Sequence, residues 1–397
     1  MEPDVNTIEG QQEGKKTNLF LRILAFLVTA ALVLGAGFLI VNWEKVNIDF
    51  VKRWFAYRSL ARNESGQVES FSYNGGVHSA FAELDGDLLV CSSTGVRLYS
   101  ASGAAYVDQP CVLKNPVLDT GGSAALVYDA GGTDLYVYQN REEVFSLTGD
   151  ATKAILSATL SAQGLLTVVT RTGSAKGAVT VYDADFHPMF GVNLSSRFVT
   201  DAILSPDGGT LALATSGQTG GIYDSQIAFY KLNRSADNTQ PDAVCSLGND
   251  TVLALDWSAS PLRVLGENTL SFVSTGGSLA GSYPYNYRYL KGFSLGGDGF
   301  CTLLLGKYRA GTEAELVTVG PDGSELASLT VGEQILSLSS AGKYLSVLTA
   351  DALSLYTGAL EPYHTTGDLQ GTRKVLQRPD GSVLLIAREN ARLYLPR

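Results

Sequence analysis

The sequence predicts an all-β protein, an eight-bladed β-propeller that follows a single N-terminal transmembrane helix. Three observations predict this arrangement. One continuous apolar stretch lies near the N-terminus, and after it a unit of short β-rich runs recurs eight times. An extra strand before the first complete unit matches a strand that the last unit lacks.

Composition excludes several classes of protein. The chain has 397 residues, of which 45% are hydrophobic and only 17% are charged, so it can bury a core and is not intrinsically disordered. Its 39 acidic and 29 basic residues give a net charge of −10, and no basic block follows residue 60. Because this balance repels a phosphate backbone, we expect no nucleic-acid partner.

The apolar stretch at 19–41 is the one segment that does not read as globular. Its 23 residues carry a single charge, Arg22, near the start. At about 1.5 Å per residue it is long enough to cross a hydrocarbon layer of about 30 Å. Since no convincing cleavage site follows, we expect an uncleaved single-pass anchor behind a short cytoplasmic tail at 1–18. The less favoured alternative is a buried core helix.

Basic residues flank this anchor on both sides. Three precede or begin it and four follow it, so the charge rule alone favours a propeller inside the cell. A lone N-terminal anchor most often displays a translocated domain, and long domains translocate largely regardless of charge. We therefore expect a cell-membrane protein with an extracytoplasmic propeller. The basic residues are Lys15, Lys16 and Arg22, then Lys45, Lys52, Arg53 and Arg58.

A linker at 42–65 joins the anchor to the repeats. Phe50, Trp54 and Tyr57 recur in it at helical spacing, with basic residues between them. This pattern indicates either a short juxtamembrane helix on anionic headgroups or a plain connecting helix.

The repeats at 66–397 each contain a β-hairpin, recognised by alternating apolar residues around a Gly-, Ser- or Asn-rich turn. A short apolar strand precedes each hairpin, as at 199–209, and a fourth strand follows most of them, as at 320–329. Four strands in about 41 residues are typical of a propeller blade. Seven blades are the alternative, because the hairpin at 262–273 is the weakest. The hairpins span 87–100, 124–138, 165–183, 210–230, 262–273, 300–319, 344–356 and 382–396.

The two ends of the repeat region indicate a closed ring. The last unit stops after its third strand, and a spare strand at 67–74 precedes the first unit. The N-terminal strand would then complete the final blade and remove an open sheet edge. A sandwich or a solenoid does not account for this match.

Turn motifs within the repeats resemble those of WD40-like and YVTN-like propellers. Ser-Pro-Asp-Gly at 205–208 precedes Leu-Ala-Leu-Ala at 211–214, and Pro-Asp-Gly recurs at 321–323 and 379–381. The Gly-His and Trp-Asp dipeptides of WD40 repeats proper are absent. Quinoprotein-type propellers, also similar in blade number, need about one docking Trp per blade. The repeats here contain Trp257 alone, so we expect no quinone and no other cofactor.

The whole layout of short tail, anchor, basic aromatic linker and Trp-poor propeller resembles the DUF5711 family of membrane-anchored proteins from Clostridia-type Gram-positive bacteria. This resemblance implies a membrane-anchored bacterial propeller. It carries over no functional residues.

Catalytic and metal-binding motifs are absent from the sequence. The histidines lie in different repeats, without metal-ligand spacing, and no G-x-S-x-G elbow occurs. The cysteines have no C-x-x-C spacing, so we expect neither a metal site, nor a disulfide framework, nor a catalytic residue. These residues are His78, His187 and His364, and Cys91, Cys111, Cys245 and Cys301.

One cluster suggests a binding surface. The run Ser-Tyr-Pro-Tyr-Asn-Tyr-Arg-Tyr at 282–289 lies where one blade crosses to the next, on the face of a propeller that usually binds partners. Tyrosines beside Arg and Asn are typical of recognition surfaces for peptides or glycans. The alternative is that alternate tyrosines simply pack one strand face. The candidate partner-binding residues are Tyr283, Tyr285, Asn286, Tyr287, Arg288 and Tyr289.

The favoured function is a membrane-anchored, non-enzymatic scaffold that binds a protein or a cell-wall component. A different class stays open, an envelope hydrolase or lyase with its site in the propeller channel. A cytoplasm-facing sensor for another membrane protein is the third hypothesis.

Overall fold

The computed structural model describes residues 23–30, 33, 48–58, 60, 62–63, 66–75, 79–150, 152–234 and 240–396. The chain forms two compact units, Met1–Phe55 and Ala56–Arg397. Residues 23–30 and 33 are helical, and the rest of the predicted anchor at 19–41 lies outside the described residues. Among the described residues, no helix has the length and apolar character needed to span a membrane. Helix α2 covers Ile48–Tyr57, inside the predicted linker.

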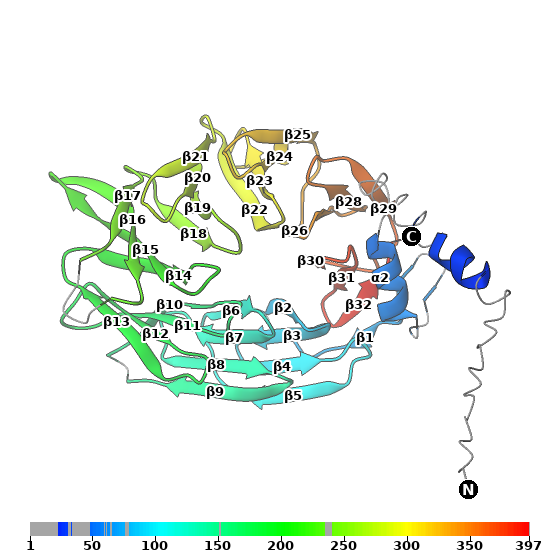
Figure 1. Cartoon of the computed structure of the whole chain (residues 1–397), viewed down its shortest axis with the longest axis horizontal. Helices are drawn as coiled ribbons and strands as arrows, with labels where there is room; N and C mark the ends of the chain where they lie inside the picture. Colours follow the sequence, from blue (N-terminus) through cyan, green and yellow to red (C-terminus); the bar gives the residue numbers. More distant parts are fainter. Residues whose placement is uncertain are drawn as a thin grey trace, which may run out of the picture. The chain divides into compact units, whose positions relative to one another are not determined.

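Eight four-stranded antiparallel sheets make up the second unit, which confirms the predicted all-β, eight-bladed propeller. We number the blades 1–8 from β2 onward. In Figure 1 the sheets follow one another around a ring, with strands such as β6, β10, β14 and β22 on its inner side. The weak hairpin at 262–273 forms the two middle strands of a complete blade, the fifth, so the count is eight.

Each blade has an inner, a second, a third and an outer strand. The inner strands are β2 Ala80–Leu84, β6 Pro116–Gly121, β10 Ile155–Leu160, β14 Phe198–Leu204, β18 Val252–Asp256, β22 Tyr289–Gly297, β26 Ser337–Ala341 and β30 Lys374–Gln377. The second strands are β3 Asp87–Ser92, β7 Ala124–Asp129, β11 Leu166–Thr170, β15 Thr210–Thr219, β19 Leu262–Gly266, β23 Phe300–Gly306, β27 Tyr344–Leu348 and β31 Val383–Ile386.

The third strands are β4 Gly95–Tyr99, β8 Asp134–Gln139, β12 Gly177–Tyr182, β16 Ile222–Lys231, β20 Thr269–Val273, β24 Ala314–Val319, β28 Leu353–Thr357 and β32 Asn390–Tyr394. The outer strands are β5 Ala105–Pro110, β9 Glu142–Thr148, β13 Pro188–Leu194, β17 Ala243–Ser246, β21 Leu279–Pro284, β25 Glu325–Val331, β29 Pro362–Thr366 and β1 Phe71–Ser72.

The core lies between neighbouring blades, and the residue types of each strand follow how far that strand is buried. The second strands read as continuous apolar runs because both of their faces are covered, and all six residues of β3 are buried. Outer strands such as β9 keep most of their side chains in contact with solvent. Apolar residues therefore concentrate in the second and third strands, the hairpins by which the repeat is recognised in the sequence.

The N-terminal strand belongs to the last blade, as the unmatched first and last strands predict. Phe71 and Ser72 of β1 pair with Ala391 and Asn390 of β32. The backbone N–H of Val68 also donates to the Leu393 carbonyl at 2.9 Å. The two ends of the described ring thus meet within one sheet, which leaves no unpaired edge between them.

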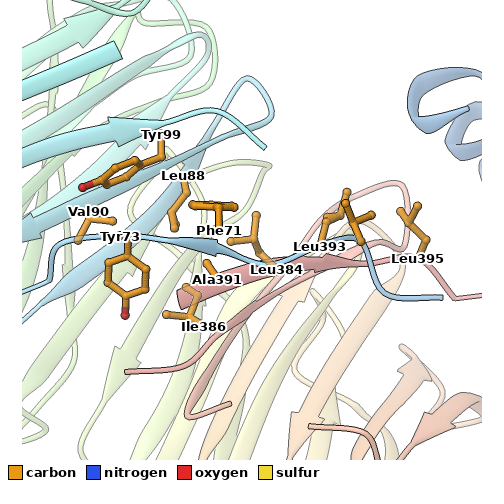
Figure 2. Close-up of a cluster of buried hydrophobic side chains, with 11 residues drawn as sticks. Phe71, Tyr73, Leu88, Val90, Tyr99, Leu384, Ile386, Ala391, Leu393 and Leu395 are labelled. Atoms are coloured by element: carbon orange, nitrogen blue, oxygen red, sulfur yellow. The ribbon is translucent and has the colours of Figure 1, made fainter. Parts of the chain in front are cut away.

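A cluster of buried side chains packs this last blade against blade 1 (Figure 2). The Phe71 ring lies 6.2 Å from the Tyr99 ring, and the Tyr73 hydroxyl donates to the Ala387 carbonyl at 2.6 Å. Gly103, at φ +87°, lies directly over Phe71, and a Cβ there would come within 2.5 Å of the Phe71 Cβ. We call this group the seam cluster. Its buried members are Val68, Phe71, Tyr73, Leu88, Val90, Tyr99, Leu384, Ile386, Ala391, Leu393 and Leu395.

Polar side chains join the inner strands of neighbouring blades. The Leu160 N–H of blade 3 donates to the Asp119 carboxylate of blade 2 at 2.7 Å, and the Ser340 N–H of blade 7 donates to Ser294 of blade 6 at 2.8 Å. Asp201 of blade 4 accepts in the same way from the next blade. Each inner strand has an edge without a strand partner, so these side chains satisfy its backbone donors.

Candidate functional site

The two faces of the ring differ in the connections that they carry. Strand order places the turns between inner and second strands on one face. The opposite face carries the turns between second and third strands and the crossings from one blade to the next. We call it the crossing face. A cavity of about 890 Å³ opens on it, lined by residues of blades 5, 6 and 7 that include Leu253, Tyr287, Arg309 and Glu333. We call it the Tyr287 cavity.

The predicted tyrosine patch divides at this cavity. Tyr283 and Tyr285 are buried in the core between blades 5 and 6, and the Tyr285 hydroxyl donates to the Gly266 carbonyl at 3.1 Å. Tyr287 is fully exposed at 102%, and Tyr289 is exposed at 42%. Among the candidate partner-binding residues, Tyr287, Tyr289 and the exposed Asn286 are therefore the side chains most accessible to solvent.

A tight turn produces this division. Asn286 and Tyr287 have φ of 53° and 66°, and the Arg288 N–H donates to the Tyr285 carbonyl at 3.1 Å. Two successive left-handed residues are typical of a type I′ turn, which favours Asn and then Gly. A Tyr in the second position costs about 1 kcal/mol. Because Tyr287 is fully exposed, no packing within the described chain offsets this cost.

A network of partly buried polar groups holds the turn in place. The Arg288 Nε donates to the Tyr285 carbonyl at 2.8 Å, and its other nitrogens donate to the Glu315 carboxylate and to the Tyr283 hydroxyl. The Tyr283 hydroxyl donates in turn to Glu325 at 2.6 Å. This bond holds the pKa of Glu325 below its usual value, while burial raises the pKa of Tyr283. Arg288 is thus a positioning residue for Tyr287.

Charges of both signs line the Tyr287 cavity. The Arg309 guanidinium lies over the Tyr289 ring, 5.5 Å from its centroid, and Lys291 donates to the Gly311 carbonyl at 2.6 Å. Glu267 and Glu333 also line the cavity. In the described part of the chain, neither carboxylate forms an ion pair, and Arg309 meets only the aromatic face. The cavity can therefore recognise a ligand through aromatic contact and through charge–charge contacts of either sign.

The sequence analysis identified the tyrosine-rich turn of the Tyr287 cavity but not the other residues that line it. Leu253, Arg309 and Glu333 come from three blades that the ring brings together. Arg309 follows Lys307 and Tyr308 in the turn between β23 and β24. That basic aromatic run is the signal that could have pointed to this turn.

The histidines lie apart from this site wherever they are described. His187 is in a turn with Asp183, with 3.7 Å between Nδ1 and Oδ1. The His364 ring lies 5.8 Å from the Tyr394 ring, and burial lowers its pKa. His78 lies outside the described residues. Within the described ranges, no group of three His, Cys, Asp or Glu side chains could hold a metal ion.

The cysteines are free thiols at four separate positions. Cys91, Cys245 and Cys301 are buried, and Cys111 is partly buried. Burial raises the pKa of Cys91 and Cys301 to about 12. A thiol reacts as its thiolate, so these two side chains are inert at neutral pH.

Comparisons with known proteins support the fold. Residues 62–255, just under half of the chain, match the model of DUF5711, described as a family of unknown function, which bears out the predicted resemblance. A search of curated protein sequences found no match.

Three solved structures show the same fold at low sequence identity. The C-terminal WD40 domain of Sif2 is 12% identical, with a TM-score of 0.56 over 84% of this chain and 97% of that one. A europium-containing methanol dehydrogenase is 9% identical, with a TM-score of 0.53 over 83% and 86%. A eukaryotic initiation factor is 11% identical, with a TM-score of 0.51 over 84% and 87%. At these identities the likeness shows the fold alone.

Proposed function

We propose that this DUF5711-like propeller is a non-catalytic binding scaffold, anchored in the cell membrane by residues 19–41, whose Tyr287 cavity engages a protein or a cell-wall component. Propellers often serve as scaffolds. One observation carries the proposal: a fully exposed tyrosine, held in a left-handed conformation, lines a cavity of about 890 Å³. Strained residues concentrate at binding sites, where the rest of the structure holds them in place.

The surroundings of Tyr287 fit this role. Arg288, with its partners Glu315 and Tyr283, fixes the turn before any ligand arrives, which reduces the entropy lost on binding. Tyr and Arg are also the residue types that most often carry binding energy in interfaces. A polyanion would meet Glu267 and Glu333 in the same cavity, so a ligand of balanced charge fits better.

Substitution of Tyr287 separates binding from folding. Tyr287→Gly removes the ring and suits the left-handed turn, so we expect it to keep stability or to raise it by about 1 kcal/mol. A photo-crosslinking amino acid at Tyr308, in the turn beside the cavity, would report on the partner in intact membranes. We expect one discrete adduct in the parent chain and its loss in Tyr287→Gly.

The matched control is Tyr106→Ala. Tyr106 is a half-exposed tyrosine on β5 of blade 1, far from the cavity in the ring order. The Tyr106→Ala substitution should leave the yield of the crosslinked adduct unchanged. Equal adduct yields in the parent, Tyr287→Gly and Tyr106→Ala chains would contradict a binding role for the cavity.

The anchor and its orientation have their own test. The apolar length of 19–41 supports a single span, and the preference of lone N-terminal anchors supports a propeller outside the cell. We expect alkaline phosphatase fused after Arg397 to be active and a cytoplasmic reporter at the same place to be inactive. The reverse pattern would favour the cytoplasm-facing sensor, and release of the chain by alkaline carbonate would contradict the anchor.

A hydrolase or lyase with its site at the ring axis is the second candidate function. Burial raises the pKa of Asp119 to about 6, in the range that suits a general acid. The same carboxylate accepts the Leu160 N–H, which already gives it a structural role. Soluble fragments released from isolated cell walls by the parent chain, and not by Asp119→Asn, would favour the enzyme over the scaffold.

A further inference from the structure

We propose that a second cavity, beside β32, binds a phosphate group that carries a proton, as in hydrogen phosphate or a phosphate monoester. This cavity measures about 310 Å³ and is lined by residues 62–63 and 67–70 together with Gln370 and Arg392. We call it the Arg392 cavity. It shares no lining residue with the Tyr287 cavity, and its ligand is independent of the proposed scaffold function.

The first observation is a buried guanidinium that forms no ion pair in the described part of the chain. Arg392 is 2% exposed, and its terminal nitrogens donate to the side-chain oxygen of Gln370 at 2.8 Å and to the Leu369 carbonyl. Both acceptors are neutral. Its Nε is buried and has no hydrogen-bond partner. A buried charge is costly unless an opposite charge or several hydrogen bonds compensate it, so this site favours an anion.

The second observation is a buried acceptor in the same wall. Gln67 is 3% exposed, and its amide nitrogen donates to the Asp368 carbonyl. That bond fixes the orientation of the amide and leaves Oε1 buried without a donor. Two residues that line the cavity therefore carry buried unpartnered groups, a donor on Arg392 and an acceptor on Gln67.

A protonated phosphate complements both groups. Its oxygens accept from a guanidinium, and its P–OH donates to an amide oxygen. Sulfate has the same shape, but at neutral pH it carries no proton to donate. A carboxylate is ionised at that pH and likewise offers no donor. The pairing of Arg392 with Gln67 thus favours a protonated phosphate over sulfate and over carboxylates.

The remaining wall adds one positive and one negative charge. Arg62 is exposed and supplies a second guanidinium, while Glu69 is the one acid in the lining. Arg62 pairs with Val68 in an antiparallel bridge, and the Gln67 N–H donates to the Asn63 side chain at 2.8 Å, so the wall is ordered. Burial lowers the pKa of Arg392, an effect that the nearby Asp368 opposes. A bound anion would, like Asp368, raise the pKa of Arg392 and so stabilise its charged form.

A phosphate titration of the full chain tests the proposal. The chain is held in a maltoside detergent, which contains no phosphate, and its melting temperature is followed by tryptophan fluorescence. We expect a saturable rise with inorganic phosphate that sodium sulfate and sodium chloride at equal ionic strength do not reproduce. An equal response to all three salts would overturn the proposal and leave water as the occupant of the cavity.

Two exposed positions sharpen this test without disturbing the core. Arg62→Gln removes one charge-assisted contact and should weaken phosphate affinity about tenfold. Glu69→Gln removes the opposing charge and should tighten it. Unchanged affinity in both variants would place any bound phosphate elsewhere on the protein. Arg392→Gln is a further variant, used only if circular dichroism shows that it still folds.

The phosphate could belong to a small solute or to a lipid headgroup, and ligands of matched chemistry separate these sources. Glycerol 3-phosphate and short-chain phosphatidic acid both carry a phosphate monoester, whereas phosphatidylcholine does not. Equal potency of the two monoesters indicates a soluble ligand. Much greater potency of phosphatidic acid, lost in Arg62→Gln, indicates a lipid headgroup.

Discussion

Replacing Phe71 by Ala is expected to lower the free energy of unfolding by about 3–5 kcal/mol, as for other large-to-small changes of buried aromatic residues. Phe71 is 9% exposed and lies in the seam cluster between the last blade and blade 1. Its ring packs against Tyr99, and Gly103 closes over it. The cavity left behind weakens the contact that keeps the N-terminal strand in the ring. Urea denaturation followed by tryptophan fluorescence measures the change.

Phe198→Ala provides the matched control. Phe198 is 54% exposed on β14, and the Lys176 ammonium lies 5.0 Å from its ring centroid. Loss of this exposed cation–π contact should cost no more than about 1 kcal/mol. If Phe71→Ala and Phe198→Ala were equally mild, the seam cluster would not be what holds the ring closed.

Asp119→Asn is expected to stabilise the protein at neutral pH, by up to about 3 kcal/mol. Burial raises the pKa of Asp119 from 3.8 in the unfolded chain to about 6 in the folded one. A carboxyl with a raised pKa contributes stability that is complete below pH 3.8 and is lost as the pH rises through about 6. Asparagine keeps an oxygen that can accept the Leu160 N–H and carries no charge at any pH.

Urea denaturation of the parent and Asp119→Asn chains at pH 4 and pH 7.5 checks the direction of this pH dependence. The stabilisation should be present at pH 7.5 and nearly absent at pH 4. Asp207→Asn is a control of opposite sign, because the Ser205 hydroxyl holds the pKa of Asp207 below its ordinary value. That variant should lose stability at both pH values, because a carboxyl with a lowered pKa contributes stability that is lost only as the pH falls below 3.8. A pH-independent effect of Asp119→Asn would show that its charge is not the cause.

The propeller was predictable because its cause is local and repeated. Each blade buries a hairpin on both faces, so the apolar runs can be recognised even at 262–273. The turn motif at 205–208 marks the boundary between an inner and a second strand. Closure was predictable from counting strands, because the spare strand before the first unit matches the strand that the last unit lacks, and joining them removes an open edge.

The candidate site was less predictable, for two physical reasons. Strand alternation treats Tyr283, Tyr285 and Tyr287 as one row, whereas the left-handed turn reverses the chain and sends Tyr287 to solvent. Side chains from distant parts of the sequence also meet only in the closed ring. Arg392 and Gln67 lie near opposite ends of the propeller region, so no local pattern could have joined them.

The brief pairing of β1 gives the ring a mechanical weak point. Tension on the N-terminal segment first loads the hydrogen bond from Arg378 to the Tyr57 hydroxyl, at 3.2 Å. It then loads the hydrogen bond from Val68 to Leu393, at 2.9 Å, and last the pairing of Phe71 and Ser72 with β32. Every other outer strand follows the third strand of its own blade in the chain, whereas β1 is held on β32 by pairing and packing alone. Pulling on the N-terminus would therefore peel off one strand and open the ring into an arc, with the other blades intact. The N-terminal strand would then act as a tension-release latch.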